Sequence, residues 1–281
     1  MFEKVLFATD FSGYAEKMTE CMGEIPGVKE IVLLHVIDPK RFGYWEESQE
    51  ILVTRAELLL KEKAELFRSA GKKVKAMVTV GIPSKEILRI ADEECVSLIV
   101  IGARGMNTLR GVLTGSASFE VLRYGKVSTL LMRYKILEKL EGIVFEKYCE
   151  RTFSRVLYPV EFPAGPERVL SLIKEMPPAD KVVLVHVIIG EGTEKELEGR
   201  IGEAEVVLKG MQDDLKAAGQ DASYHVHAGY PAIEINRVAE EEDASLIVMD
   251  ARGEAGEGKA RITGATENVV RTTSRPVLVI K

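Results

Sequence analysis

Cysteine is scarce in this chain, and no segment is apolar for long. The three cysteines, Cys21, Cys95 and Cys149, are far apart and lack a CxxC spacing, which argues against a disulfide framework or a cysteine metal site. No apolar run approaches the ~18 residues that a membrane span requires. The first residues form a strand pattern and contain no charged segment followed by a long apolar one. We therefore expect a cytoplasmic protein.

An excess of positive charge is also missing. The formal net charge is -6, and acidic and basic residues are mixed along the whole length. Because nucleic acids and anionic membranes select basic surfaces, neither is an expected partner. The sequence has no GxxxxGK[ST] loop, no GxSxG turn and no kinase-type catalytic set. It therefore assigns no catalytic residue.

The clearest feature that is present is an internal repeat. Segments of the first half recur in the second half at nearly constant separation, which indicates two homologous domains. We predict domains over 1–140 and 153–281, joined by a linker over 141–152. The matching pairs are 4–11 with 155–162, 31–37 with 182–188, Gly81-Ile-Pro83 with Gly229-Tyr-Pro231, and 97–100 with 245–248.

Short apolar runs alternate with helical patterns within each half. This alternation predicts an α/β fold, in which each domain has a five-stranded parallel sheet sandwiched by helices. Between the domains, Ile136, Leu140 and Val144 recur every four residues, which predicts a packed helix there. In the first half we expect strands over 4–9, 30–37, 74–80, 97–101 and 128–133, and helices over 13–24, 50–70, 84–94 and 116–124.

A glycine pattern follows the fourth expected strand. Gly102 and Gly105 come directly after that strand, and Gly115 and Ser116 follow after nine further residues. Glycine lets the backbone approach a ligand closely, and the free amides of a helix beginning near Ser116 favour an anion. The pattern predicts a phosphate-binding loop, with a plain strand-to-helix turn as the alternative.

Together, Val5-Leu-Phe-Ala-Thr-Asp-Phe-Ser12, Leu34-His-Val-Ile-Asp38, Gly81-Ile-Pro83 and the glycine pattern resemble the universal stress protein family, here as a tandem pair. The glycine pattern resembles the ATP-binding branch of that family. The resemblance implies two Rossmann-like domains of the adenine nucleotide alpha hydrolase-like type. It also implies an ATP-binding regulatory protein of the stress response, with the nucleotide in the first domain and Mg²⁺ bridging its phosphates.

The resemblance also assigns roles in a nucleotide site. Asp10, with Thr9 beside it, would read the adenine or ribose, although Asp10 is alternatively the N-cap of the following helix. Val36 and Ile101 would flank the base. Phosphate and ribose contacts would come from Gly102, Gly105, Gly115, Ser116, Ala117 and Ser118.

The second half departs from this pattern. Glu161 stands at the position of Asp10, and Asp250 replaces Gly102, although Gly253 keeps the second glycine. The loop over 254–263 has ten residues instead of nine, and Ala265 lacks the hydroxyl of Ser116. An added carboxylate opposes phosphate. We therefore predict that the second domain binds ATP weakly or not at all and serves as a structural or regulatory partner.

Several functional alternatives stay open at this stage. Bound nucleotide could order the loop over 103–115 and change a surface that an unidentified regulatory partner reads. The chain could instead be a slow ATPase, transfer phosphate to Ser116 or Ser118, or act as a nucleotide-free scaffold. The final strands, 129–132 and 277–280, could pair within the chain as a pseudo-dimer or support a homodimer.

The histidines suggest structural roles. His35 and His186 occupy equivalent strand positions, where burial in the sheet layer is favoured over catalysis. His225 and His227 alternate onto one face of a strand, the spacing that a metal pair would need. Because no cysteine or carboxylate cluster completes such a site, we favour a structural role and assign no metal.

Overall fold

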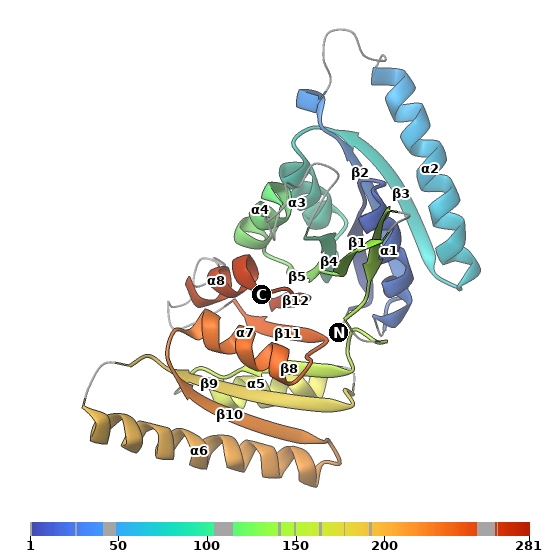
Figure 1. Cartoon of the computed structure of the whole chain (residues 1–281). Helices are drawn as coiled ribbons and strands as arrows, with labels where there is room; N and C mark the ends of the chain where they lie inside the picture. Colours follow the sequence, from blue (N-terminus) through green and yellow to red (C-terminus); the bar gives the residue numbers. More distant parts are fainter. Residues whose placement is uncertain are drawn as a thin grey trace. The chain divides into compact units, whose positions relative to one another are not determined.

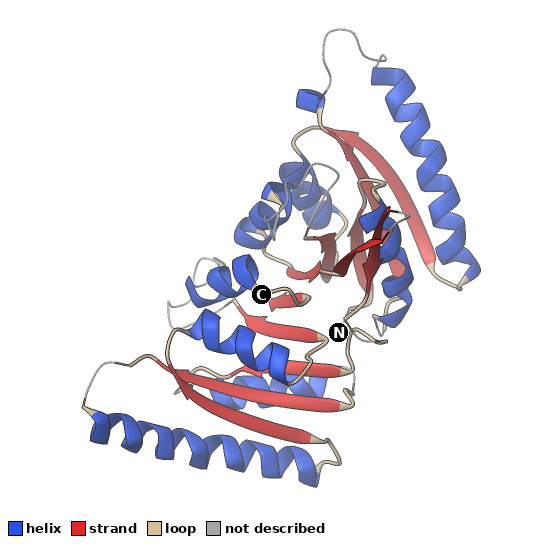
Figure 2. Ribbon diagram, in the orientation of Figure 1, coloured by secondary structure: helices blue, strands red, loops and turns tan. Residues whose placement is uncertain are grey.

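The structure is a computed structural model that describes residues 2–25, 27–41, 49–103, 115–139, 142–148, 150–162, 165–176, 178–190, 193–251, 262 and 264–281. Two compact units make up the chain. The first comprises Met1–Met132 together with Lys281, and the second comprises Arg133–Ile280. Each unit alternates strands with helices along the chain (Figures 1 and 2).

Unit 1 is a parallel sheet with helices on both faces. Its described residues form five parallel strands, as the sequence predicted, and the strand order is β3-β2-β1-β4-β5. The elements are β1 (Lys4–Ala8), α1 (Gly13–Cys21), the 3-10 turn Met22–Glu24, β2 (Glu30–Ile37), the 3-10 turn Pro39–Arg41, α2 (Gln49–Ser69), β3 (Lys73–Val80), α3 (Pro83–Glu93), β4 (Leu98–Gly102), α4 (Ser116–Tyr124) and β5 (Ser128–Met132).

The strand order reverses direction between β1 and β4. The chain runs outward from β1 through β2 to β3, and then returns to the other side of β1 with β4. The register places Phe7 of β1 between Leu33 of β2 and Val100 of β4. In open sheets of this kind, ligands bind beyond the carboxyl ends of the strands at such a switch point. The segments that follow Ala8 of β1 and Gly102 of β4 lie at that point.

Apolar strands with both faces covered form the core of unit 1. Val5, Leu6 and Phe7 are fully buried, because helices cover both faces of the sheet (Figure 1). Helix α2 turns its small and apolar positions inward, and Phe67 meets Phe7 edge-on with ring centroids 6.1 Å apart. Gly71 then adopts a φ of 78°, a left-handed conformation that ends the helix at little cost for glycine.

Unit 2 repeats this architecture. Its described residues form parallel strands in the order β10-β9-β8-β11-β12. Gly219 follows α6 in the same left-handed conformation as Gly71. Asp243 likewise has a positive φ, as Cys95 has at the matched position of unit 1. The elements are β8 (Arg155–Pro159), α5 (Gly165–Glu175), β9 (Lys181–Ile188), α6 (Glu194–Ala217), β10 (Ala222–Ala228), α7 (Pro231–Glu241), β11 (Leu246–Asp250), α8 (Gly264–Thr272) and β12 (Val277–Ile280).

The prediction of a helix between the repeats is wrong. That segment is an antiparallel hairpin of β6 (Lys135–Lys139) and β7 (Gly142–Glu146). Ile136 lies opposite Phe145 and Leu137 opposite Val144. Such branched and aromatic residues gain more from cross-strand packing than from a helix. The Leu140 of the predicted spacing lies outside the described residues.

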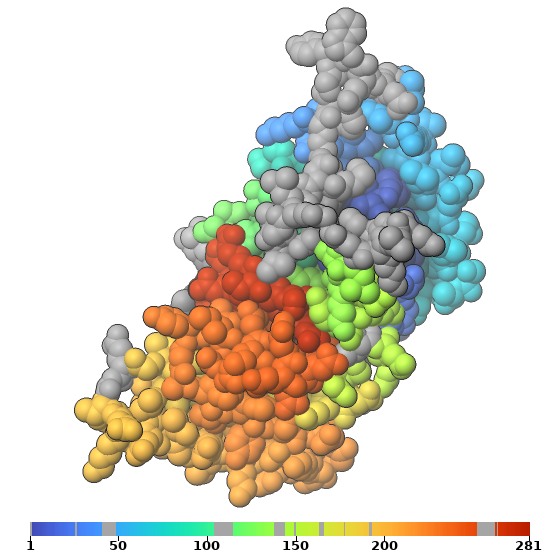
Figure 3. All heavy atoms as spheres, in the orientation of Figure 1, coloured from blue at the N-terminus to red at the C-terminus, as the bar shows by residue number. Residues whose placement is uncertain are grey.

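The long helices α2 and α6 lie at the outer surface of their own units (Figure 3). Apart from Lys63 of α2, the buried residues of both helices are small or apolar. Among the described residues, no helix combines the length and the apolar character that crossing a membrane requires.

Candidate functional site

The turn after β1 is held by side chains of its own residues. Thr9 is buried, and its amide donates to the Leu34 carbonyl oxygen at 2.9 Å. One carboxylate oxygen of Asp10 accepts from the Ser12 amide at 3.1 Å and from the Ser12 hydroxyl at 2.6 Å. Ser12 in turn caps α1 by accepting from the Ala15 amide. The N-cap is therefore Ser12, and Asp10 braces the cap from the turn.

A stacked pair of rings, His35 and Phe11, supports this turn. The ring of His35 lies 4.4 Å from that of Phe11, inclined by 30°. Its Nδ1 lies 2.8 Å from the Thr9 carbonyl oxygen, and because a carbonyl can only accept, Nδ1 carries the proton. Phe11 has a φ of 60°, which is uncommon for an aromatic residue and is typical of functional turns. Sequence reasoning missed this pair, although Phe11 recurs as Phe162.

A pocket of about 850 Å³ opens beside this turn. It runs from the carboxyl ends of β1 and β2 to the inward face of α2. Asp10 and Val36, two predicted site residues, share it. The contribution of α2, including Leu59 and Arg55, was not predicted, because these residues read as parts of an ordinary amphipathic helix. The full lining is Asp10, Phe11, Glu16, His35, Val36, Ile37, Asp38, Leu52, Arg55, Ala56, Leu59, Glu62, Lys63 and Leu66.

The other predicted residues gather where β4 leads into α4. Gly115 is the N-cap of α4, has no capping side chain and donates from its amide to the Ala103 carbonyl oxygen at 2.6 Å. Ser118 is buried, and its hydroxyl donates to the Gly102 carbonyl oxygen at 2.6 Å. A hydroxyl has one hydrogen, and this bond uses it. Of the groups of Ser118, only the backbone amide can then donate to a ligand.

The remaining predicted residues flank this junction. Ser116 and Ala117 begin α4, and Ile101 is buried in β4. Gly105, and with it the whole of 104–114, lies outside the described residues. The structure therefore forms two groups, one around Asp10 and Val36 in the pocket and one around Gly102 and Ser118 at the start of α4.

Unit 2 repeats the supporting pair of rings but not the chemistry of the turn. Phe162 stacks on His186 at 4.0 Å, and His186 Nδ1 lies 2.7 Å from the Val160 carbonyl oxygen. Burial lowers the pKa of His186 below its ordinary value of 6.5. Asp250, at the end of β11, forms an ion pair with Arg168 of α5. An ion-paired carboxylate thus stands at the position that Gly102 occupies in unit 1.

One of the two histidines of β10 is paired with a carboxylate. His225 Nε2 lies 2.7 Å from Glu242 Oε1, and the second oxygen of Glu242 accepts from Lys181 at 2.6 Å. His227 stacks on His225 at 5.8 Å. Within the described parts of the chain, no three His, Cys, Asp or Glu side chains group as a metal site would.

The parallel strand order, with helices on both faces of the sheet, defines each unit as a Rossmann-like α/β domain. The model of the Universal stress protein family matches residues 1–133 and 152–281. The chain therefore belongs to this family and carries its domain twice, as the sequence predicted.

Individual relatives agree with this assignment. The chain is 28% identical over 157 residues to Universal stress protein MJ0577 of Methanocaldococcus jannaschii, which covers 48% of this chain and 97% of that one. It is 34% identical over 99 residues to Universal stress protein YxiE of Bacillus subtilis, covering 35% and 62%. The crystal structure of a universal stress protein from Archaeoglobus fulgidus matches with a TM-score of 0.71 at 25% identity, covering 99% and 96%.

Proposed function

We propose that unit 1 binds ATP and that the protein is a nucleotide-dependent regulator in the stress response. The observation that carries this proposal is the position of Asp10 and Gly102, which follow or end the two strands that flank the switch point of the sheet. An acceptor for a nucleoside and a glycine without a side chain thus lie at the edge where open α/β sheets take their ligands.

The pocket suits the nucleoside end of the ligand. Its volume of about 850 Å³ is within the usual range of about 300–1,000 Å³ for small-molecule sites. Val36 and Leu59 supply apolar wall for a base. The carboxylate of Asp10 accepts hydrogen bonds from an amine or a ribose hydroxyl and repels phosphate. Adenosine therefore belongs beside Asp10, and the phosphates point away from it.

The start of α4 suits the phosphate end. The first amides of a helix have no acceptor within the helix, and the helix dipole favours an anion there. Gly115 caps α4 without a side chain, so the amides of Ser116, Ala117 and Ser118 serve phosphate in this proposal. Gly102 adds no Cβ to this junction. Bound Mg²⁺ would offset the charge of the phosphates.

Binding, rather than phosphoryl transfer, is the function that these residues support best. Ser118 is a poor acceptor for a phosphoryl group. The residue is only 6% exposed, and its hydroxyl donates to the Gly102 carbonyl oxygen. Among the described residues, no side chain is hydrogen-bonded to the exposed Ser116 hydroxyl as a general base would be.

Isothermal titration of nucleotide-stripped protein with ATP and Mg²⁺ tests the proposal. We expect about one site per chain in the wild type. Asp10→Ala and Gly102→Asp should each weaken binding about tenfold or more, because an acceptor is lost or a carboxylate is added beside phosphate. Absence of binding in the wild type would reject the proposal.

Matched controls separate these effects from general damage. Asp92→Ala removes an exposed carboxylate of the same unit, and Gly23→Asp adds one where a Cβ meets no atom within 4 Å. Both should bind ATP like the wild type. A loss equal to that of the site variants would mean that the site variants act through folding.

A further inference from the structure

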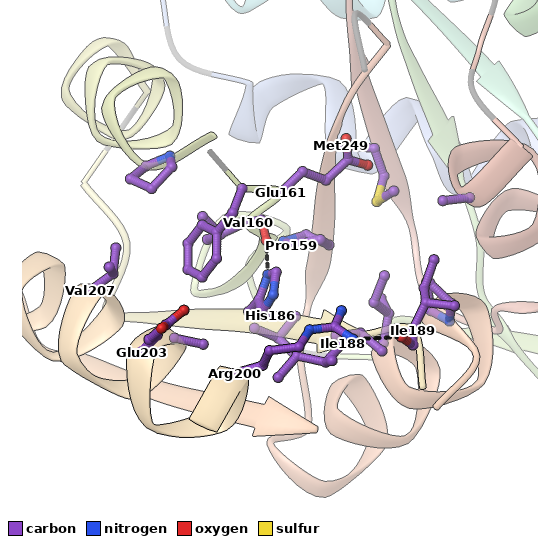
Figure 4. A pocket seen from close by; sticks show the side chains of 18 residues that line it. Pro159, Val160, Glu161, His186, Ile188, Ile189, Arg200, Glu203, Val207 and Met249 are labelled. Carbon is purple, nitrogen blue, oxygen red and sulfur yellow. Dashed lines mark hydrogen bonds between the residues drawn. The ribbon is translucent and has the colours of Figure 1, made fainter. Parts of the chain in front are cut away.

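Unit 2 has a pocket of its own, also about 850 Å³ in volume. It lies at the carboxyl edge of the sheet, where it passes over the ends of β9, β8 and β11 (Figure 4). These three strands are neighbours in the sheet, so the pocket spans two strand spacings, or ~10 Å. It also reaches α6 and the beginnings of α7 and α8. Its shape suits an extended ligand.

Exposed apolar side chains border this pocket. Ile189, Tyr230 and Ile233, which we call the apolar rim, are 63%, 76% and 62% exposed. Ile189 follows the last residue of β9 and is itself part of the lining. Tyr230 lies in the neighbouring chain segment, because the Gly229 amide donates to the Ile188 carbonyl oxygen at 2.9 Å. Ile233 is in the first turn of α7, and its amide donates to the Tyr230 carbonyl oxygen at 2.9 Å.

The fold does not require this rim. In unit 1, Asp38 and Lys85 take the places of Ile189 and Ile233. At the third place unit 1 has Ile82, which is only 38% exposed. Exposure of large apolar side chains to water is unfavourable, and an apolar patch beside a cavity marks contact with an apolar ligand. Unit 2 thus has an apolar border where unit 1 has charged residues.

The interior wall continues the rim. Ile235 and Met249 are buried aliphatic residues of the lining, and Val207 of α6 lines it with 40% exposure. The stacked rings of Phe162 and His186 add a flat aromatic surface. A hydrocarbon body can therefore contact apolar side chains along the whole pocket.

The charged residues of the lining do not select the ligand. Glu161, Arg200 and Glu203 are all exposed, so they can stay in water when a ligand binds. Arg200 also donates to the Ile189 carbonyl oxygen at 3.3 Å (Figure 4). The free energy that a ligand gains here comes from the apolar surface that it buries.

We propose that the unit 2 pocket binds the hydrocarbon chain of a lipid-like ligand. The chain lies across the ends of the three strands, its polar head stays in solvent, and the apolar rim covers the part that leaves the pocket. The ~10 Å length of the pocket fits a chain better than a compact ring, and rim and wall favour each methylene that is buried. This site is separate from the ATP site proposed for unit 1.

Titration of the full chain with alkan-1-ols, from 1-butanol to 1-octanol, tests the proposal. These probes carry no charge and differ only in chain length. We expect saturable binding of 1-octanol, with an affinity that rises about three- to fourfold for each added methylene. Octane-1,8-diol is the matched probe of equal length. It should bind about tenfold more weakly or worse, because one of its hydroxyls must enter the apolar wall.

Matched variants locate the site. Val207→Trp fills the pocket from α6 and should abolish 1-octanol binding. Leu59→Trp makes the same change at the matched position of the unit 1 pocket and should leave that binding unchanged. The double variant Ile189→Asp, Ile233→Lys gives the rim the residues of unit 1 and should weaken 1-octanol about fivefold or more. Val206→Lys changes an exposed apolar residue of α6 outside the lining, and should bind like the wild type.

Four results would overturn the proposal. The first is no saturable binding of 1-octanol up to its solubility limit, and the second is an affinity that does not rise with chain length. The third is wild-type affinity in Val207→Trp, or a loss in Leu59→Trp of the same size as in Val207→Trp. The fourth is wild-type affinity in the double rim variant, whose substitutions are exposed and so report on the site even if Val207→Trp fails to fold.

Discussion

The hydroxyl of Ser118 donates a 2.6 Å hydrogen bond to the carbonyl oxygen of Gly102 and so joins the first turn of α4 to the last residue of β4. Both partners are buried. Removal of the hydroxyl leaves a buried carbonyl oxygen without this donor. Ser118→Ala should therefore lower the free energy of unfolding by about 1–2 kcal/mol, measured by urea denaturation.

Ser116 provides the control for that measurement, because it is an exposed serine of the same helix turn. Ser116→Ala should change the free energy of unfolding by no more than about 0.5 kcal/mol. Equal stability of the two variants would show that the Ser118 bond does not stabilise the junction.

Lys63 offers a second test, because it is a buried cation on the inward face of α2. Its ammonium donates to Glu16 Oε1 at 2.7 Å and to Thr19 Oγ1 at 3.2 Å. Unit 2 has the buried Met211 at the matched position. Because Glu16 is 57% exposed and stays hydrated without its partner, Lys63→Met removes the desolvation cost of the ammonium and leaves no unpaired buried charge. Lys63→Met should therefore leave the free energy of unfolding within about 1 kcal/mol of the wild type, or raise it.

Lys63→Ala is the comparison for this substitution. It removes the same charge but leaves a cavity, which should cost about 2 kcal/mol or more. If urea denaturation gave Lys63→Met the same loss as Lys63→Ala, the ion pair itself would be the source of the stability.

The pair of Asp243 and Arg275 should make stability depend on acid pH. The Arg275 guanidinium donates to Asp243 at 2.8 Å and holds the pKa of that carboxyl below its ordinary value of 3.8. A lowered folded-state pKa stabilises the protein above the unfolded-state pKa, and this stability is lost as pH falls through the folded-state value. Because Asp243 is half-exposed, Asp243→Asn should cost about 1 kcal/mol at pH 6.

The difference in the free energy of unfolding between wild type and Asp243→Asn should then shrink as the pH is lowered from about 4 toward 2. Asn tolerates the left-handed backbone that Asp243 adopts, with a φ of 47°, so the substitution isolates the charge. Urea denaturation across this pH range measures the difference. A difference that stays constant or widens in acid would contradict a stabilising role for the Asp243–Arg275 pair.

His35→Phe should weaken ATP binding, although His35 contacts no phosphate in the proposed site. The new ring can still stack on Phe11, but the bond to the Thr9 carbonyl is lost, and with it the support of the turn that carries Asp10. We expect about 1 kcal/mol lower stability and a several-fold weaker ATP titration. His186→Phe should lower stability to a similar extent. Wild-type ATP affinity in His35→Phe would mean that the turn holds its shape without this bond.

Much of the fold could be predicted from the sequence, because its strands are buried on both faces and read as short apolar runs. The predicted bounds of β2 and of α4 agree with the structure. The hairpin after β5 was missed, since spacing every four residues is also met by short strands whose branched residues pair across a turn. There, the helical period conflicts with pairing between adjacent strands, and pairing prevails.

The candidate site was harder to predict for a different reason. Asp10 and Gly102 could be recognised because glycine and carboxylate at strand ends carry local signals. Arg55 and Glu203 could not, because a charged residue on a long helix usually faces solvent. Only the packing of α2 and α6 beside their sheets brings these side chains to the pockets. Likewise, the stack of His35 on Phe11 joins residues of separate elements.

The same histidine-to-carbonyl bond supports the turn beside both pockets, at 2.8 Å in unit 1 and 2.7 Å in unit 2. It uses a ring nitrogen and a backbone oxygen, so it does not depend on which side chains face the ligand. A duplicated domain built in this way can exchange its ligand-facing residues and keep its fold.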